Sequence, residues 1–207
     1  MYLAIKGFGE KEIVINKSRF ICSVNRANTK EEALEFIKSI KKTHYNATHN
    51  CYAYIIGENR LIQKSSDDGE PSGTAGIPIL EVLKKFNLTD TVCVVTRYFG
   101  GIKLGASGLI RAYSTSCSET INEVGIIEKK LMQLIDIELD YSQIGLFDNK
   151  FKQYDLVNKT YLEKVTYTYQ IDIEKTTKFI QDIIEYTNNN IKYAFKDKVI
   201  CEVDYSN

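Results

Sequence analysis

The chain has 207 residues, of which 43% are hydrophobic and 26% charged, and its 27 basic side chains balance 27 acidic ones. This composition is typical of a soluble globular protein, and the absence of a long apolar run excludes a membrane-spanning chain and an extensively disordered one. The first residues lack the basic start and apolar middle of an export signal, so we expect a cytoplasmic protein with no membrane role.

The charges are unevenly distributed along the sequence. Residues 1–130 contain 18 basic and 14 acidic side chains, including all five arginines, whereas residues 131–207 contain 9 basic and 13 acidic ones. Nucleic-acid affinity depends largely on cations that neutralise phosphates. Any nucleic-acid-binding role is therefore expected in the first part of the chain.

The five cysteines are odd in number and widely spaced, and no pair forms a Cys-x-x-Cys motif. Such spacing does not favour a disulfide framework or a structural zinc site. We expect reduced, mostly buried thiols at Cys22, Cys51, Cys93, Cys117 and Cys201.

Hydrophobic periodicity predicts an α+β domain over residues 1–130. Thr29 is suited to cap a helix because Glu32 follows three residues later, and Lys41 and Lys42 suit its last turn. Strands are expected at residues 12–16, 19–25, 51–56, 60–64 and 91–96, and helices at about 29–42, 79–86 and 106–123.

A second domain is expected over residues 131–207. Its pattern predicts a strand at 132–140, a helix at 142–154, strands at 157–163 and 165–173, a helix at 174–187 and a strand at 191–203. This β-α-β-β-α-β order is that of a ferredoxin-like sandwich. The clean alternation of residues 165–173 is typical of a sheet with one solvated face.

Two glycine-rich loops, residues 66–78 and 98–108, are the most distinctive segments of the first domain. They contain both prolines of the chain, Pro71 and Pro78, and seven of its twelve glycines. Glycine adopts backbone angles that other residues avoid, whereas proline stiffens the chain. We expect both loops to have defined shapes and to meet as one concave surface.

The second loop predicts an anion-binding site. Glycine amides before a helix N-terminus can converge on a phosphate or a carboxylate, and neighbouring cations would add to the attraction. The residues expected at this site are Arg97, Gly100, Gly101, Lys103, Gly105, Ser107, Gly108 and Arg111.

The first loop allows two interpretations of its three carboxylates. They either hold Mg²⁺ or cap the amides of the glycine turns, and capping is favoured because such metal sites normally include a substrate phosphate. The residues expected to shape this loop are Asp67, Asp68, Gly69, Glu70, Pro71, Gly73, Thr74 and Gly76.

Supporting roles are expected at His44, His49, Cys51 and Tyr98. The spacing of the first three allows metal ligation, but hydrogen-bonded packing is the favoured interpretation, and we predict no metal site. Cys51 with His49 resembles a nucleophile and its base without an orienting third group. Tyr98, together with Phe99, is a candidate platform for base stacking.

Two stretches closely resemble the signature of the Impact family, in particular its bacterial YigZ branch. Residues 66–76 read Ser-Asp-Asp-Gly-Glu-Pro-Ser-Gly-Thr-Ala-Gly, and residues 94–113 read Val-Val-Thr-Arg-Tyr-Phe-Gly-Gly-Ile-Lys-Leu-Gly-Ala-Ser-Gly-Leu-Ile-Arg-Ala-Tyr. The resemblance implies a first domain like ribosomal protein S5 domain 2 and a second like the C-terminal domains of elongation factor G.

The same resemblance implies a translation-linked role. We expect a non-enzymatic regulator that binds RNA, the ribosome or a translation factor. The alternative is an enzyme, which would be either a nucleotide- or Mg²⁺-dependent enzyme that binds a phosphorylated ligand or a hydrolase. Small-molecule kinases share the S5-like fold, although fold alone does not establish chemistry. Neither the catalytic residues nor the oligomeric state follows from the sequence.

Overall fold

The computed structural model describes residues 1–205, which form two compact units. The first unit comprises Met1–Lys129 and the end of the chain from Val203, and the second comprises Lys130–Glu202. The amide of Tyr205 donates to the carbonyl of Ile126 at 3.0 Å, which joins the end of the chain to the first unit. This return does not follow from the sequence patterns.

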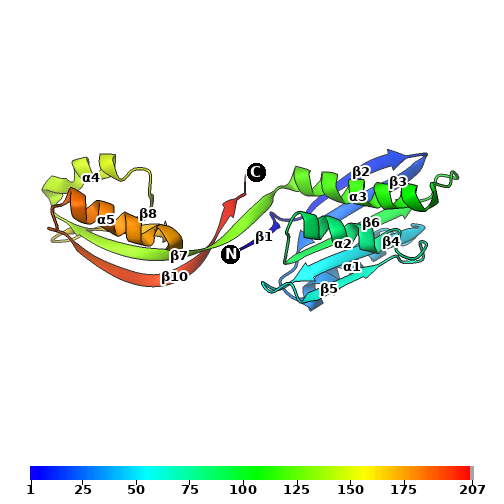
Figure 1. Cartoon of the computed structure of the whole chain (residues 1–207), viewed down its shortest axis with the longest axis horizontal. Helices are drawn as coiled ribbons and strands as arrows, with labels where there is room; N and C mark the ends of the chain where they lie inside the picture. Colours follow the sequence, from blue (N-terminus) through cyan, green and yellow to red (C-terminus); the bar gives the residue numbers. More distant parts are fainter. Residues whose placement is uncertain (206–207) are drawn as a thin grey trace. The chain divides into compact units, whose positions relative to one another are not determined.

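The first unit is built on an antiparallel sheet of strand order β2-β3-β6-β4-β5 (Figure 1). Its elements in chain order are β1 (Tyr2–Ile5), β2 (Gly9–Ile15), β3 (Ser18–Arg26), α1 (Lys30–Thr43), β4 (His49–Ile56), β5 (Ile62–Ser66), α2 (Gly76–Lys85), β6 (Thr91–Tyr98), α3 (Gly105–Val124) and the start of β7 (Ile126–Leu139). β1 pairs with the first residues of β7.

Helices cover both faces of this sheet. Successive residues of β6 point to opposite faces, so Cys93 and Val95 pack in the core beneath α2 and α3, whereas Val92 and Val94 pack against α1. The central strand is therefore buried on both faces, which explains its unbroken apolar run. Strand β6 ends at Tyr98, and the second glycine-rich loop continues from it.

The predicted cap of α1 is confirmed. The hydroxyl of Thr29 accepts a hydrogen bond from the amide of Glu32 at 3.2 Å, and Lys41 and Lys42 lie in the last turn. The predicted apolar stripe is only partly buried, because Leu34 faces solvent.

The second unit has the predicted ferredoxin-like architecture, and the two-domain α+β fold class is confirmed. Its sheet has the strand order β10-β7-β9-β8. The remaining elements are α4 (Ile144–Lys150), β8 (Asp155–Tyr161), β9 (Val165–Asp172), α5 (Thr176–Tyr186) and β10 (Lys192–Asp204), with short 3-10 turns at Tyr141–Gln143 and Ile173–Lys175. Alternate side chains of β9 are buried with Phe147, Phe151 and Phe179.

Candidate functional site

Both glycine-rich loops line one cavity of about 450 Å³ in the first unit. We call it the two-loop cavity. Its wall consists of Thr48 and His49 at the start of β4, Glu70 and Pro71 from the first loop, Arg97 from β6, Phe99, Lys103 and Leu104 from the second loop, and Gly105, Ala106 and Leu109 from α3. The two loops meet, as the sequence predicts.

Asp67 shapes the first loop by accepting three backbone amides. The amide of Gly73 donates to Oδ2 at 2.9 Å, and those of Ala75 and Gly76 donate to Oδ1 at 3.0 and 2.8 Å. Burial alone would raise the pKa of Asp67, but the three amides outweigh it, so the pKa lies below its ordinary value. This carboxylate caps the turn and the start of α2, as the capping interpretation expects.

Asp68 holds the same loop against β4 and α1. Its Oδ2 accepts the amide of Asn50 at 2.7 Å, and its Oδ1 lies 2.6 Å from the ammonium of Lys41. Its carbonyl lies 2.9 Å from Nδ1 of His49. Among residues 1–205, the oxygens of Asp67, Asp68 and Glu70 do not converge as a metal-ligand group. The geometry therefore favours capping over the Mg²⁺ alternative.

The other residues expected to shape the first loop lie within it or at its end. The hydroxyl of Thr74 donates to the carbonyl of Pro71 at 2.7 Å, which closes the turn before α2. Gly69 and Gly73 have positive φ angles of 93° and 77°, and Gly76 is the first residue of α2. The loop has a defined backbone shape, in keeping with its glycine and proline content.

A buried ion pair joins the first loop to the end of β6, just before the second loop. Glu70 Oε1 lies 2.6 Å from Arg97 Nη1 and accepts the hydroxyl of Tyr113 at 2.8 Å. The guanidinium of Arg97 also lies over the rings of Phe20 and Phe99, 5.4 and 5.3 Å from their centroids. The sequence predicts that Arg97 contributes a cation to an anion site, but Glu70 neutralises that charge. Arg97 instead connects the first loop to the end of β6.

Cys51 is unsuited to nucleophilic chemistry. Burial raises the pKa of its thiol to about 12, and the nearby carboxylates of Glu70, Asp68 and Asp67 act in the same direction. Its Sγ donates to the carbonyl of Asp67 at 2.9 Å. The side chain is a hydrogen-bonded packing group, as the favoured interpretation of the sequence expects.

His44 and Tyr98 pair with each other and are not among the cavity-lining residues. The Nδ1 atom of His44 lies 2.9 Å from the hydroxyl of Tyr98, and the two rings meet edge to face. Their supporting role is therefore to hold the end of β6 near the segment after α1. Phe99, which is 46% exposed, lines the cavity in place of Tyr98.

Gly100 fixes the second loop against the turn between β2 and β3. Its amide donates to Ser18 Oγ at 3.1 Å, and a Cβ atom added at this position would lie 2.0 Å from the backbone carbonyl atoms of Lys17. This amide is already bonded within the protein. The predicted nest of consecutive glycine amides around one anion is therefore incomplete, although Gly101 and Gly105 do adopt positive φ angles.

Replacing Gly100 with alanine is expected to lower the free energy of unfolding of the first unit by about 1–3 kcal/mol. The added methyl group meets rigid backbone, so either the turn or the loop must move. Urea unfolding of the variant measures this loss. Gly7→Ala is the matched control, because a Cβ atom there meets nothing within 4 Å. Equal stability of the two variants would contradict the close contact.

The first turn of α3 divides the predicted anion-site residues into two groups. The helix begins at Gly105, so Ser107 and Gly108 belong to the helix and not to the loop. At 100° per residue, Gly105, Ala106 and Leu109 share the face that lines the cavity, whereas Ser107 and Arg111 fall on the opposite side. Ser107, Gly108 and Arg111 are thus not among the residues that line the cavity, and their role in anion binding stays a prediction.

Several wall residues were not predicted from the sequence. Leu104, Ala106 and Leu109 are small or apolar and carry no chemical signal, although helical spacing from Gly105 would have found the last two. Tyr113 lies four residues beyond Leu109 on the same helix face and is fully buried against Glu70. Lys103, by contrast, was predicted and lines the cavity.

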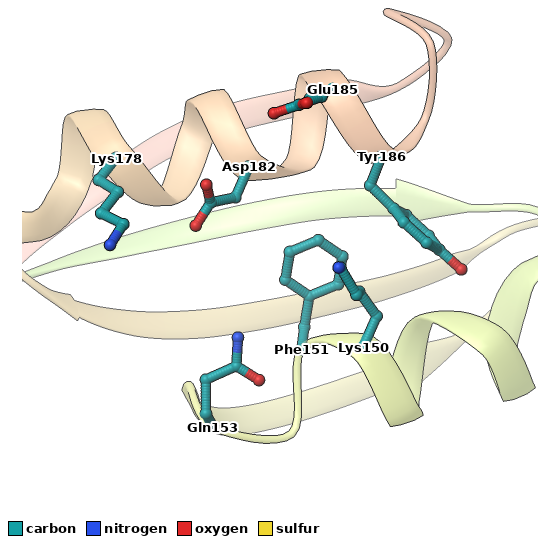
Figure 2. Close-up of a pocket in the computed structure, with 7 residues that line it drawn as sticks. All are labelled: Lys150, Phe151, Gln153, Lys178, Asp182, Glu185 and Tyr186. Carbon is teal, nitrogen blue, oxygen red and sulfur yellow. The ribbon is translucent and has the colours of Figure 1, made fainter.

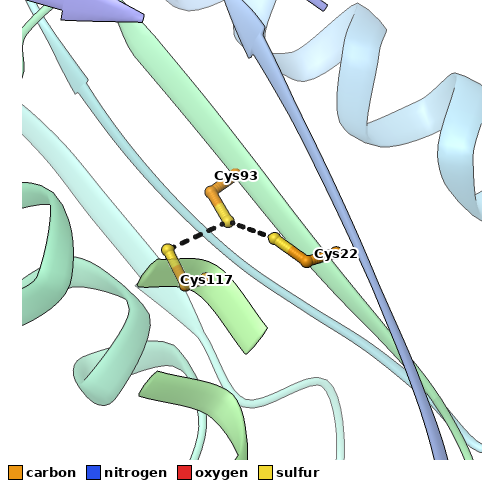
Figure 3. A group of neighbouring side chains, drawn as sticks. All are labelled: Cys22, Cys93 and Cys117. Carbon is orange, nitrogen blue, oxygen red and sulfur yellow. Dashed lines mark hydrogen bonds between the residues drawn. The ribbon is translucent and has the colours of Figure 1, made fainter. Parts of the chain in front are cut away.

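Three thiols form a second cluster, in the core of the first unit (Figure 3). Cys93 Sγ on β6 lies 3.4 Å from Cys22 Sγ on β3 and 3.4 Å from Cys117 Sγ on α3, and all three side chains are fully buried. A structural zinc site normally has four ligands, and the described residues supply three here. The cluster is part of the hydrophobic core. The spacing of the three cysteines along the sequence did not predict that they would meet.

The second unit has a separate cavity of about 530 Å³ between α4 and α5 (Figure 2). Side chains of both charges line it, including Lys150 and Lys178 on one hand and Asp182 and Glu185 on the other. Tyr154 donates its hydroxyl to Asp182 at 2.8 Å. Because its charges are balanced and mostly on flexible side chains, this cavity is a weaker candidate than the two-loop cavity.

Comparison with known proteins identifies the family. Residues 16–121 match the Impact N-terminal domain, and residues 137–190 match a domain of unknown function, DUF1949. The chain belongs to the IMPACT family. The resemblance read from the loop residues is thereby confirmed. Both loops, and with them the two-loop cavity, lie within the IMPACT domain match.

Bacterial relatives resemble most of the chain. The IMPACT family member YvyE of Bacillus subtilis is 53% identical over 189 residues, covering 90% of this chain and 87% of that protein. YigZ of Escherichia coli is 29% identical, covering 86% and 89% of the two chains. The similarity to protein IMPACT of Danio rerio, which is not bacterial, is shorter. It is 37% identical over 79 residues, covering 37% of this chain and 24% of that protein.

A solved structure supports the fold of this IMPACT family chain. The crystal structure of a hypothetical protein is 26% identical with a TM-score of 0.60, and the similarity covers 95% of this chain and 97% of that one. Within the part of the chain that the structure describes, no helix is both long enough and apolar enough to cross a bilayer.

Proposed function

We propose that this chain is a non-enzymatic, translation-associated protein that binds single-stranded RNA, free or in the ribosome, through the two-loop cavity. The observation that carries the proposal is the presence of a cation, open helix amides and an exposed aromatic ring on one wall. Proteins that bind single strands combine cationic grooves with aromatic side chains on which bases stack. The translation-associated part rests on the family resemblance.

The charges at the cavity favour an anionic group beside Lys103. The side chain of Lys103 is exposed, whereas the charge of Arg97 is neutralised by Glu70. The 20-residue helix α3 begins at the same wall, and its first turn has neither an acidic residue nor a side-chain cap. A helix N-terminus with open amides attracts phosphate. One backbone phosphate of an RNA strand matches this arrangement.

The chemistry of the neighbouring groups supports binding over catalysis. The raised pKa of Cys51 opposes a thiolate nucleophile at neutral pH. Asp67 and Asp68 are bonded to backbone amides, and Glu70 is bonded to Arg97 and Tyr113. Each of these three carboxylates is therefore engaged in holding the loops, which supports a binding protein over an enzyme.

Lys103→Glu is expected to weaken binding of a labelled single-stranded RNA by roughly tenfold and to reduce the salt slope of that binding by about 1. Phe99→Ala is expected to weaken it by about 1–3 kcal/mol, because a stacking ring is lost. Fluorescence anisotropy over a series of salt concentrations measures both effects.

Arg111→Glu is the matched control for Lys103→Glu, because it makes the same change of charge on the helix face away from the cavity. Equal loss in the two variants would contradict binding at the two-loop cavity. Thermal shifts with nucleotides and Mg²⁺ test the enzyme alternative. Strong stabilisation by one nucleotide, with no RNA affinity, would favour that alternative.

A further inference from the structure

One oxygen of the buried Glu70 carboxylate has no hydrogen-bond donor among residues 1–205. Two groups donate hydrogen bonds to this carboxylate, Arg97 Nη1 and the hydroxyl of Tyr113, and both bond to Oε1. His49 Nε2 lies 3.9 Å from Oε2, beyond hydrogen-bond range. Glu70 is only 8% exposed and lines the two-loop cavity. Oε2 is therefore available to accept a hydrogen bond from an occupant of the cavity.

His49 supplies a second acceptor beside it. Its Nδ1 atom lies 2.9 Å from the carbonyl oxygen of Asp68, which can only accept, so Nδ1 carries the ring proton. In the neutral ring, Nε2 is then an acceptor. The ring is part of the cavity wall. Oε2 and Nε2 therefore present two acceptors 3.9 Å apart to an occupant.

We infer that the two-loop cavity recognises guanine in single-stranded RNA, an inference that rests on the proposed function. Single-stranded bases are read on their Watson–Crick edges. On that edge guanine alone has two adjacent donors, N1–H and the N2 amino group. Adenine and cytosine set one amino group beside a ring acceptor, and uracil sets one N–H between two carbonyls. Each of these would direct a lone pair at Glu70 or His49.

The remaining wall is consistent with this orientation. A phosphodiester group has no hydrogen-bond donor, so the base and not the backbone meets the acceptor pair. The exposed ring of Phe99 offers a stacking surface for that base, and Pro71 and Leu104 add apolar wall. Lys103 and the first backbone amides of α3 remain available to bind the phosphate. A cavity of about 450 Å³ lies within the range that small-molecule sites occupy.

Changing one base of the RNA tests this inference without altering the protein. The probes are labelled uridine hexamers in which one central nucleotide is guanosine, inosine, adenosine or uridine, measured by anisotropy at one salt concentration. We expect the guanosine hexamer to bind about tenfold more tightly than the adenosine and uridine hexamers. Inosine lacks the N2 amino group and is expected to bind with intermediate affinity.

A matched pair of variants locates the selectivity. His49→Ala is expected to reduce the preference for guanosine over uridine, whereas Arg111→Glu is expected to retain it. Equal affinity for all four hexamers, with binding still weakened by Lys103→Glu, would overturn the guanine inference and leave the RNA proposal standing. Failure of every hexamer to bind at low salt would overturn both. Retained preference in a folded His49→Ala chain would also overturn the acceptor pair.

Discussion

Glu70→Gln is expected to lower the free energy of unfolding of the first unit by about 3–5 kcal/mol, the cost of breaking a buried ion pair. The substitution preserves the size of the side chain but leaves the charge of Arg97 without its partner, and Arg97 is only 5% exposed. It also weakens the bond from Tyr113. Urea unfolding followed by hydrogen exchange of the β6 amides reports on this unit.

The double variant Glu70→Gln with Arg97→Met is the control for this prediction. Removing both charges leaves no unpaired ion, so the double variant is expected to recover most of the lost stability. Recovery identifies the ion pair as the source of the effect. A loss below about 1 kcal/mol in Glu70→Gln alone, on the scale of an exposed pair, would show that the pair does not hold the loops together.

Asp67→Ala is expected to lower the free energy of unfolding of the first unit by about 2–4 kcal/mol, because the amides of Gly73, Ala75 and Gly76 all lose their acceptor. The same urea and exchange experiment measures it. Glu35→Ala, on the exposed face of α1, is the control for removing a carboxylate and is expected to change stability by less than about 0.5 kcal/mol.

The contribution of Asp67 is also expected to depend on pH. Its pKa is lower in the folded chain than in the unfolded one, so its stabilisation is present above the unfolded pKa of about 4 and is lost as pH falls through the folded pKa. The stability difference between the natural chain and Asp67→Ala should therefore shrink below about pH 4. A difference that stays constant down to pH 2 would contradict the amide cap.

Local patterns of the sequence predicted the parts of the fold that local interactions determine. The cap at Thr29 needs only Glu32, three residues away, and the alternation of β9 follows from one buried sheet face. The glycines and prolines of the two loops likewise predicted where the cavity lies. Backbone shape at such residues is largely a local property.

Partnerships between distant residues could not be predicted in the same way. Glu70 meets Tyr113 43 residues later, and only the packing of α3 on the sheet brings them together. That pairing removes Arg97 as a free cation and leaves one oxygen of Glu70 open. The start of α3 at Gly105 likewise decided which loop residues face the cavity. The position of Arg97 beside the second loop predicted a cation at the anion site, but it did not predict that Glu70 would pair with it.

The most direct test of the account is an NMR titration of the isotope-labelled chain with a uridine hexamer that contains one guanosine. We expect the amide signals of Thr48, Phe99, Lys103 and Ala106, all at the two-loop cavity, to shift first and to saturate together. Shifts confined to the second unit, or signals at the cavity that do not move while RNA binds, would contradict it.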